Sequence, residues 1–141
     1  MPPRFADASV FVHAYLKPRR QLRTGEVLIK KRAQAIVTRI GQGEPVFLST
    51  VHFAEIANLL EDWMVLREAQ AVQLGLATMD NVRILSVTRN DLLDALTVAA
   101  EGEVGTTDAL AVLLMRREGS REIYSFDRDF DRFDDVRRVG Q

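Results

Sequence analysis

Hydrophobic and polar residues alternate along the chain in short blocks that predict alternating strands and helices. Brief apolar runs bounded by turn-forming residues are typical of buried strands, and longer segments with apolar residues every three or four positions are typical of helices. Strands are expected at residues 4–7, 45–48, 81–87, 122–126 and 136–139. Helices are expected at about residues 9–16, 26–40, 50–62, 65–79, 90–102 and 106–115. The expected cap residues are Ser9 for the first helix, Ser49 or Thr50 for the third, and Asn90 or Asp91 for the fifth.

This alternation predicts a parallel sheet with helices on both of its faces. We therefore expect an α/β fold, with a three-layer α/β/α arrangement around a central, mostly parallel sheet of four to five strands. The chain has 141 residues, and 47% of them are hydrophobic, which is enough for one packed core. Since no repeat, low-complexity tract or linker divides it, residues 1–141 are expected to form a single domain.

The segment around Asp108 has the features of a helix start next to the core. Gly105 interrupts the preceding element, Thr106 and Thr107 offer capping hydroxyls, and Asp108 follows in the first turn. The exposed N–H groups and the helix dipole favour an anion at this position. Residues 109–115 include no polar side chain, so the helix is expected to be buried on most sides.

Three further acids occupy comparable positions in distant segments. Asp7 ends the first predicted strand, Asp127 follows the fourth, and Glu55 lies about one turn into the helix after the second strand. Functional sites in open parallel sheets form at the carboxyl ends of the strands, so these acids and Asp108 are expected to converge at one edge. Any one of them could instead be a surface or capping residue, but their shared position favours a site.

Clustered carboxylates repel one another and take up protons unless a cation lies among them. The chain has no cysteine and two histidines, so ligation by oxygen atoms alone favours Mg²⁺ or Mn²⁺. An ion of this kind binds a phosphate and activates a water molecule. The expected reaction is therefore phosphodiester hydrolysis, with the four acids as metal ligands and catalytic residues.

The net charge of −1 requires that any nucleic-acid binding come from a local patch. Basic residues gather after the first predicted helix, where Arg19, Arg20 and Arg23 are candidates for contacts to an RNA backbone. The alternative is that they form a solvated surface. Trp63 is expected to be a partly buried packing or dimer residue, although aromatic side chains also stack on RNA bases.

The chain is expected to be cytoplasmic. No apolar stretch is long enough to span a bilayer, and residues 1–16 do not have the order of basic and apolar residues of a signal peptide. The absence of cysteine agrees with this expectation. His13 and His52 are expected to be structural or surface residues, since they are too few and too far apart in sequence to suggest a paired general base.

Four segments together resemble the PIN domain and, within it, the VapC-type toxins of toxin–antitoxin modules. They are DASVF from residue 7, EIANLL from residue 55, TTDALA from residue 106 and SFDRDF from residue 125. In this resemblance, the acidic metal-binding quartet of the family matches Asp7, Glu55, Asp108 and Asp127. Thr107 matches a hydroxyl residue that bonds a carboxylate or a metal-bound water, and Asp129 matches an auxiliary acid. The basic region 17–43 departs from the family pattern in its length.

The resemblance implies an endoribonuclease that depends on Mg²⁺ or Mn²⁺ and is usually a homodimer. It also implies a small antitoxin that inserts a segment into the active-site groove. A catalytically silent interaction scaffold with the same fold is the alternative, and it would bind no Mn²⁺. A receiver domain would need an acid next to Asp7 and a lysine late in the chain, and a haloacid-dehalogenase phosphatase would need an aspartate in place of Ser9.

Overall fold

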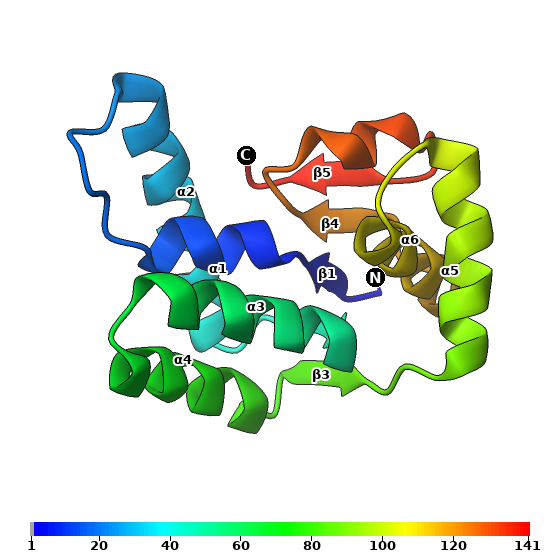
Figure 1. The fold of residues 1–141 in the computed structure, drawn as a ribbon, viewed down its shortest axis with the longest axis horizontal. Helices are drawn as coiled ribbons and strands as arrows, with labels where there is room; N and C mark the ends of the chain where they lie inside the picture. The colour runs from blue at the N-terminus through cyan, green and yellow to red at the C-terminus, as the bar shows by residue number, and fades with distance from the viewer. Residues whose placement is uncertain (1) are drawn as a thin grey trace.

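The centre of the fold is a five-stranded sheet in which all neighbouring strands are parallel (Figure 1). The computed structural model describes residues 2–141. In sheet order the strands are β3 (Val82–Leu85), β2 (Val46–Ser49), β1 (Arg4–Ala6), β4 (Glu122–Tyr124) and β5 (Arg137–Val139). The predicted fold class is confirmed, with the larger of the two expected strand numbers and no antiparallel pair among the described residues.

Within residues 2–141, six helices and one short 3₁₀ helix connect the strands. They are α1 (Ala8–Tyr15), α2 (Thr24–Gly41), α3 (Thr50–Trp63), α4 (Leu66–Thr78), α5 (Arg89–Gly102), α6 (Thr106–Glu118) and η1 (Arg128–Arg132). Helix α1 packs on both α2 and α3, α3 packs on α4, and α5 packs along α6 (Figure 1). Because parallel crossovers are right-handed, α5 and α6 lie on the face opposite α1 to α4, which gives three layers. None of the helices within residues 2–141 is both long and apolar enough for a membrane span.

The core lies along the central strands and α6. All four residues of β2 are buried, and the rings of Phe5 and Phe47 meet edge to face, with their centroids 5.2 Å apart. Residues 109–115 of α6 are buried except for the partly buried Leu113. The absence of polar side chains in this stretch therefore predicted its burial correctly. A core helix consequently carries Asp108 at its amino-terminal end.

Two helix starts differ from the prediction because other residues cap them. Helix α5 is capped by Thr88 and not by Asn90 or Asp91. The Thr88 hydroxyl accepts from the Asp91 backbone N–H at 3.2 Å, and the Asp91 carboxylate accepts from the Thr88 N–H at 2.8 Å. This reciprocal capping box begins the helix at Arg89. Helix α2 begins at Thr24, earlier than predicted.

The starts of α1 and α6 also lack the hydroxyl caps that were predicted. The residue before α1 is Asp7, and the Ser9 hydroxyl donates to the Asp7 carboxylate and does not cap the helix. The residue before α6 is Gly105, and no side chain caps that helix. By contrast, the predicted cap at Ser49 is present, since its hydroxyl accepts from the His52 N–H at 3.2 Å.

Candidate metal centre

The four predicted acids extend from different elements toward the carboxyl edge of the sheet. Asp7 follows β1, Asp127 lies shortly after β4, Glu55 is in the second turn of α3, and Asp108 is in the first turn of α6. The charges of the other three acids each raise the pKa of Asp108, as expected for carboxylates that lie near one another. The topology therefore brings the predicted acids to one place, as the strand-end rule leads one to expect.

Within this cluster, the tightest group consists of Asp108, Asp127 and Asp129. One carboxylate oxygen from each lies within 4.8 Å of the others, which is close enough for one ion to contact all three. Asp129 was predicted only as an auxiliary acid. Its backbone N–H donates to the Asp127 carboxylate at 2.9 Å, and this bond turns η1 so that both acids are near Asp108. Asp7 and Glu55 lie outside the tightest group.

Asp7 is held in place by two hydroxyl groups. It is buried, and its Oδ2 accepts hydrogen bonds from the hydroxyl of Ser9 at 2.7 Å and from that of Ser125 at 2.8 Å. Its backbone N–H donates to the Tyr124 carbonyl at 3.0 Å, continuing the pairing of β1 with β4. The other carboxylate oxygen, Oδ1, accepts no hydrogen bond from residues 2–141, so it is available to a ligand.

The same two serines join the end of β4 to the start of α1. The Ser125 hydroxyl oxygen accepts from the Asp127 N–H at 3.0 Å, and that of Ser9 accepts from the Phe126 N–H at 3.1 Å. The sequence reasoning did not assign either serine to the site. Each lies two residues from an acid, Asp7 or Asp127, and this spacing is the signal that could have identified them.

Burial and mutual repulsion disfavour full ionisation of this cluster. Burial is the largest cause that raises the pKa of Asp108 to about 7, followed by the charges of Asp127 and Asp7. The pKa of Glu55 is also raised, again first by burial and then by Asp7 and Asp127. A divalent cation would offset this repulsion, and an all-oxygen set of carboxylates suits Mg²⁺ or Mn²⁺.

A buried histidine connects the strand edge to the start of α6. His52 is neutral, since burial lowers its pKa, and its Nε2 donates to the Thr107 carbonyl at 2.9 Å. Its Nδ1 lies 2.6 Å from the Ser49 hydroxyl, which donates to it in this tautomer. The structural role expected for His52 is thus the observed one. Thr107 makes this contact through its carbonyl, and in the described chain its hydroxyl forms no hydrogen bond with a carboxylate.

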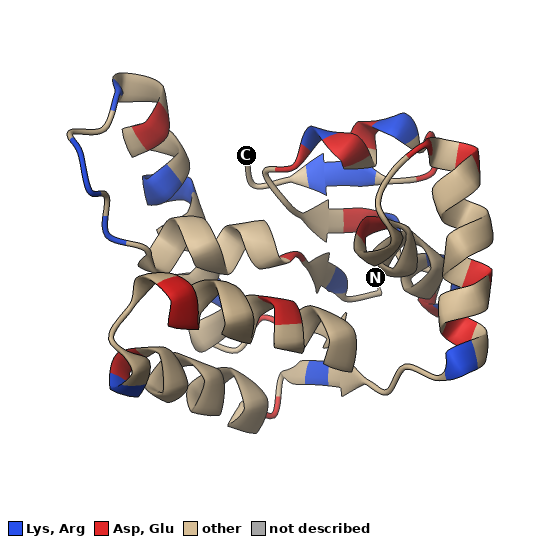
Figure 2. Cartoon of the chain, viewed as in Figure 1, with Lys and Arg blue, Asp and Glu red and all other residues tan. Residues whose placement is uncertain are grey.

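The predicted RNA-contacting arginines do not join the acids. All three lie in the loop between α1 and α2, beyond the end of α1 that is opposite Asp7 (Figure 2). Arg20 pairs with Glu26 at 2.8 Å, and Arg23 is exposed at the start of α2. The Arg19 guanidinium lies 4.4 Å from the ring centroid of Trp63, which is 54% exposed and so more open than predicted.

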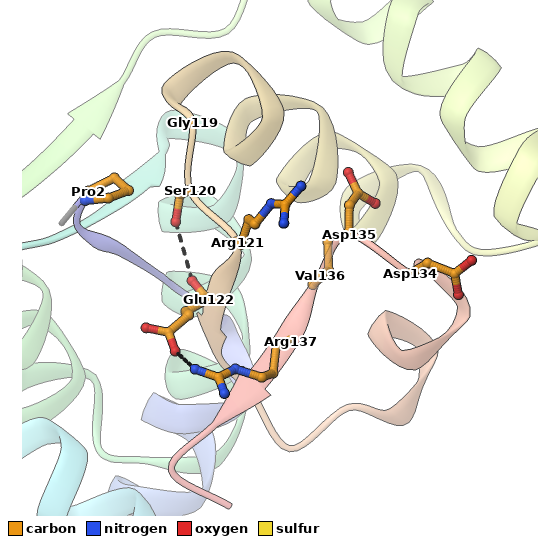
Figure 3. A pocket seen from close by; sticks show the side chains of 9 residues that line it. All are labelled: Pro2, Gly119, Ser120, Arg121, Glu122, Asp134, Asp135, Val136 and Arg137. Atoms are coloured by element: carbon orange, nitrogen blue, oxygen red, sulfur yellow. Dashed lines mark hydrogen bonds and ion pairs between the residues drawn. The ribbon is translucent and has the colours of Figure 1, made fainter.

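A separate cavity of about 420 Å³ lies at the opposite edge of the sheet, where β4 and β5 begin (Figure 3). Two of the carboxylates that line it are already paired with arginines. Glu122 binds Arg137 and Asp135 binds Arg116. These arginines keep the pKa of each carboxyl below its usual range. The group of three carboxylates with oxygen atoms within 4.8 Å of one another lies instead at the carboxyl edge, and that edge is the candidate site.

Comparison with known proteins agrees with this arrangement. The sequence profile of the PIN domain matches residues 4–136, so the chain belongs to the PIN domain family. A solved structure with the same fold is that of VapC20 from Mycobacterium tuberculosis, described as a sarcin–ricin-loop-cleaving toxin. The TM-score is 0.68 and the identity 20%, over 90% of this chain and 92% of that one. No curated protein matches the chain in sequence.

Proposed function

We propose that this protein is a metal-dependent endoribonuclease, a VapC-like toxin that hydrolyses RNA phosphodiester bonds. The observation that carries the proposal is the convergence of Asp7, Glu55, Asp108 and Asp127, with Asp129, at the carboxyl edge of a PIN fold. The single domain spans residues 1–141 in this proposal. The similarity in fold to VapC20 supports the choice of RNA as the substrate.

The proposed ligands are Asp7, Glu55, Asp108 and Asp127 for one or more Mg²⁺ or Mn²⁺ ions. Asp129 is an additional candidate ligand because it belongs to the tightest group of oxygen atoms. The bound cation supplies charge neutralisation at the scissile phosphate and a nucleophilic water at neutral pH. The Ser9 and Ser125 hydroxyls orient the Asp7 carboxylate, and His52 positions the Thr107 turn that precedes Asp108.

Glu55 and Asp108 are the acids whose pKa values are raised. Asp108, with a pKa of about 7, is partly protonated near neutral pH when no cation is close, and it releases the proton when one binds. The raised pKa of Glu55 acts in the same direction. This linkage predicts that binding of Mn²⁺ near pH 6 to 7 releases protons. The proton release is a property of the chain's own carboxyls and can be measured without any RNA.

The proposal is tested by cleavage of a mixed RNA substrate with Mg²⁺, with Mn²⁺, with EDTA, and with the Asp108→Asn variant. We expect cleavage only with metal, and a loss of at least about 100-fold in the variant, as for removal of a group that stabilises transition-state charge. Asp134→Asn is the matched control, because Asp134 is an exposed aspartate at the opposite edge of the sheet.

Cleavage that persists in EDTA or in Asp108→Asn would contradict the proposed site. The alternative function is a catalytically silent scaffold with the PIN fold. It predicts no cleavage by the wild-type chain and no heat of Mn²⁺ binding in a calorimeter. Heat of Mn²⁺ binding that disappears in Asp108→Asn would exclude the scaffold even when the RNA target is too specific for a mixed substrate.

We also propose that the protein forms a homodimer through the exposed face of α5. Leu92, Leu93 and Leu96 on this face are 40%, 57% and 51% exposed. Arg89 lies seven residues before Leu96, and Glu103 lies seven residues after it. A two-fold axis at Leu96 would therefore bring Arg89 against Glu103 of the partner subunit, while the leucines pack together. The charge pattern of this face is thus complementary to itself.

The remaining proposed partner is a small antitoxin, which follows from the likeness to VapC-type toxins. Its expected point of action is the acidic edge, where an inserted segment would compete with metal or substrate. A cationic side chain is the natural group for that segment, because the acids repel one another. As with such toxins, the proposed location is the cytoplasm.

A further inference from the structure

A groove of about 510 Å³ lies between the end of α1, the loop that follows it, the first turns of α2 and the end of α3. Its walls are mainly apolar and its rim is mainly basic. The apolar side chains are those of Val12, Leu16, Leu22, Ile29 and Trp63, and the charged ones are those of Lys17, Arg19, Arg20, Glu26 and Lys30. Pockets of this volume bind small organic ligands.

The groove contains a planar surface formed by Trp63 and Arg19. Trp63 is 54% exposed, and the Arg19 guanidinium lies 4.4 Å from the centroid of its ring. A cation–π contact of this kind orients both planar groups. Aromatic rings and arginine planes are the surfaces on which proteins stack the bases of single-stranded RNA. The pair is therefore suited to a flat, aromatic ligand.

The charges around the groove favour an anionic ligand. Its one lining acid, Glu26, is already occupied, since both of its carboxylate oxygens accept from Arg20, at 3.0 and 2.8 Å. Within residues 2–141, neither Lys17 nor Arg19 pairs with a carboxylate. Figure 2 shows the basic residues along the loop between α1 and α2. Cationic side chains without a carboxylate partner, next to an apolar groove, are complementary to a nucleotide, which has both a phosphate and a base.

The groove is also close to the acidic cluster along α1. Asp7 immediately precedes this helix and Val12 lines the groove, which is a separation of about 8 Å at the helical rise. His13, which also lines the groove, has its ring centroid 5.5 Å from that of Phe126, the residue before Asp127. A strand of RNA at the acids therefore reaches the near end of the groove along α1, and the Trp63–Arg19 pair lies beyond the far end of that helix.

We propose that this groove is a base-binding subsite for the single-stranded RNA substrate. A base stacks on the Trp63–Arg19 pair, and its phosphate contacts Lys17. The proposal rests on the ribonuclease function proposed above and adds to it a site that reads a nucleotide away from the scissile bond. An acidic segment of a partner protein is the competing occupant, but the stacked guanidinium and indole favour a planar base.

Trp63 is the only tryptophan in the chain, so its fluorescence reports directly on the groove. The full-length Asp108→Asn variant, which leaves the substrate intact, is titrated with a short single-stranded oligoribonucleotide and, separately, with inorganic polyphosphate. We expect saturable quenching by the RNA and none by polyphosphate. RNA binding that leaves the fluorescence unchanged, or equal quenching by polyphosphate, would overturn the proposal.

Variants of the groove give an independent measurement through the anisotropy of labelled RNA. Trp63→Ala should weaken binding about 10-fold, because one stacked base is lost, and Trp63→Phe should retain most of the affinity. Lys17→Ala should reduce the slope of log affinity against log salt concentration by about one, because one phosphate contact is lost. Leu74→Ala is the control, since Leu74 is an equally accessible apolar residue, 65% exposed, outside the groove. Wild-type affinity in Trp63→Ala would contradict the subsite.

These measurements separate the subsite from the nuclease. Metal-dependent cleavage by the wild-type chain, together with an unaltered affinity in Trp63→Ala, would reject the subsite and leave the nuclease intact. Quenching by RNA with neither metal-dependent cleavage nor heat of Mn²⁺ binding would support the subsite and reject the nuclease. If an acidic peptide quenched the Trp63 fluorescence and RNA did not, the competing protein occupant would be the correct one and the subsite would be rejected.

Discussion

Asp108 lies in the first turn of α6, where the helix dipole favours a carboxylate, yet its pKa is raised to about 7. Burial and the charges of the neighbouring acids outweigh the dipole at this position. Ionisation of the Asp108 carboxyl is unfavourable in this environment when no cation is bound, and it becomes favourable when one is bound. The side chain is therefore a sensitive reporter of whether the cluster holds metal.

This environment predicts that the metal-free protein becomes less stable as the pH rises. Asp108 releases its proton near 3.8 when unfolded and near 7 when folded, so between these values the folded state holds more protons. The free energy of unfolding consequently falls as the pH rises through this window. Asp108→Asn removes this titration and should stabilise the protein at pH 8 by about 1 kcal/mol, after allowance for screening by solvent.

The measurement is thermal unfolding in EDTA at pH 5 and pH 8. We expect the difference between the two melting temperatures to be smaller in Asp108→Asn than in the wild type. Asp134→Asn, a change of the same type at an exposed position, should keep the wild-type difference. An equal difference between the two melting temperatures in all three proteins would show that the charged form of Asp108 does not destabilise the fold.

The end of α5 and the residue after η1 approach each other closely at Gly102 and Phe133. A Cβ atom at this position would lie 2.3 Å from Cζ of Phe133, whose ring is buried and has little room to move. Gly102→Ala should therefore destabilise the protein by about 1–3 kcal/mol through overpacking. Gly75→Ala is the control, because Gly75 is inside α4 with open space around it, and alanine should stabilise that helix by up to about 1 kcal/mol.

Chemical denaturation measures both glycine variants. The two substitutions are identical in chemistry and differ only in their surroundings, so opposite signs are expected. If Gly102→Ala were as stable as the wild type, Phe133 would have to leave its buried position at no cost.

Among the elements, α3 and α6 are connected by one side chain. His52 on α3 reaches the Thr107 carbonyl on α6 and the Ser49 hydroxyl at the end of β2, and its ring packs edge to face on Phe5 at 4.8 Å between centroids. Glu55 and Asp108 extend from these same two helices. The relative position of two of the four acids therefore depends on this histidine.

We predict that His52→Ala weakens Mn²⁺ binding about 10-fold and destabilises the fold by about 2–3 kcal/mol. The substitution leaves a cavity and removes a hydrogen bond that positions the turn before Asp108, and such supporting contacts commonly contribute this much to metal affinity. Titration calorimetry of Mn²⁺ measures the affinity. Leu76→Ala, which truncates a buried residue of α4 away from the site, should lower stability without lowering the affinity.

If Leu76→Ala weakened Mn²⁺ binding as much as His52→Ala, the effect would follow from general loss of stability. The positioning role of His52 would then be unsupported.

For the molecule as a whole, the exposed leucines of α5 predict a dimer that a single charge disrupts. Leu96→Glu should give a monomer, because it places two carboxylates together at the proposed two-fold axis. Arg89→Glu should weaken the dimer by opposing Glu103 of the partner subunit, and the double exchange Arg89→Glu with Glu103→Arg should restore it. Sedimentation velocity measures the mass. Leu74→Glu, on the exposed face of α4, is the control.

A wild-type chain that sediments as a monomer, or a dimer that tolerates Leu96→Glu, would contradict the α5 interface. Failure of the double exchange to restore a dimer lost in Arg89→Glu would exclude the charge pairing but not the leucine contact.

Local patterns were sufficient to predict the succession of strands and helices, the parallel sheet and the burial of α6. Hydrophobic periodicity reflects which side of an element faces the core, so it can be read without knowing the neighbouring elements. The four acids could be placed at one edge for a similar reason, because the carboxyl ends of parallel strands lie together in every such sheet. Helix caps were less predictable, since Thr88 and Asn90 are both suitable residues and their geometry chose between them.

Other features depended on contacts between residues that are far apart in the chain. The hydroxyl of Ser125 bonds to Asp7 across 118 positions, and His52 bonds to Thr107 across 55. Asp129 joins Asp108 because η1 turns toward α6, and Trp63 is exposed beside Arg19 because the loop after α1 folds back to the end of α3. Periodicity specifies one face of one element, whereas a site requires distances between elements, and those distances follow from how the helices pack on the sheet.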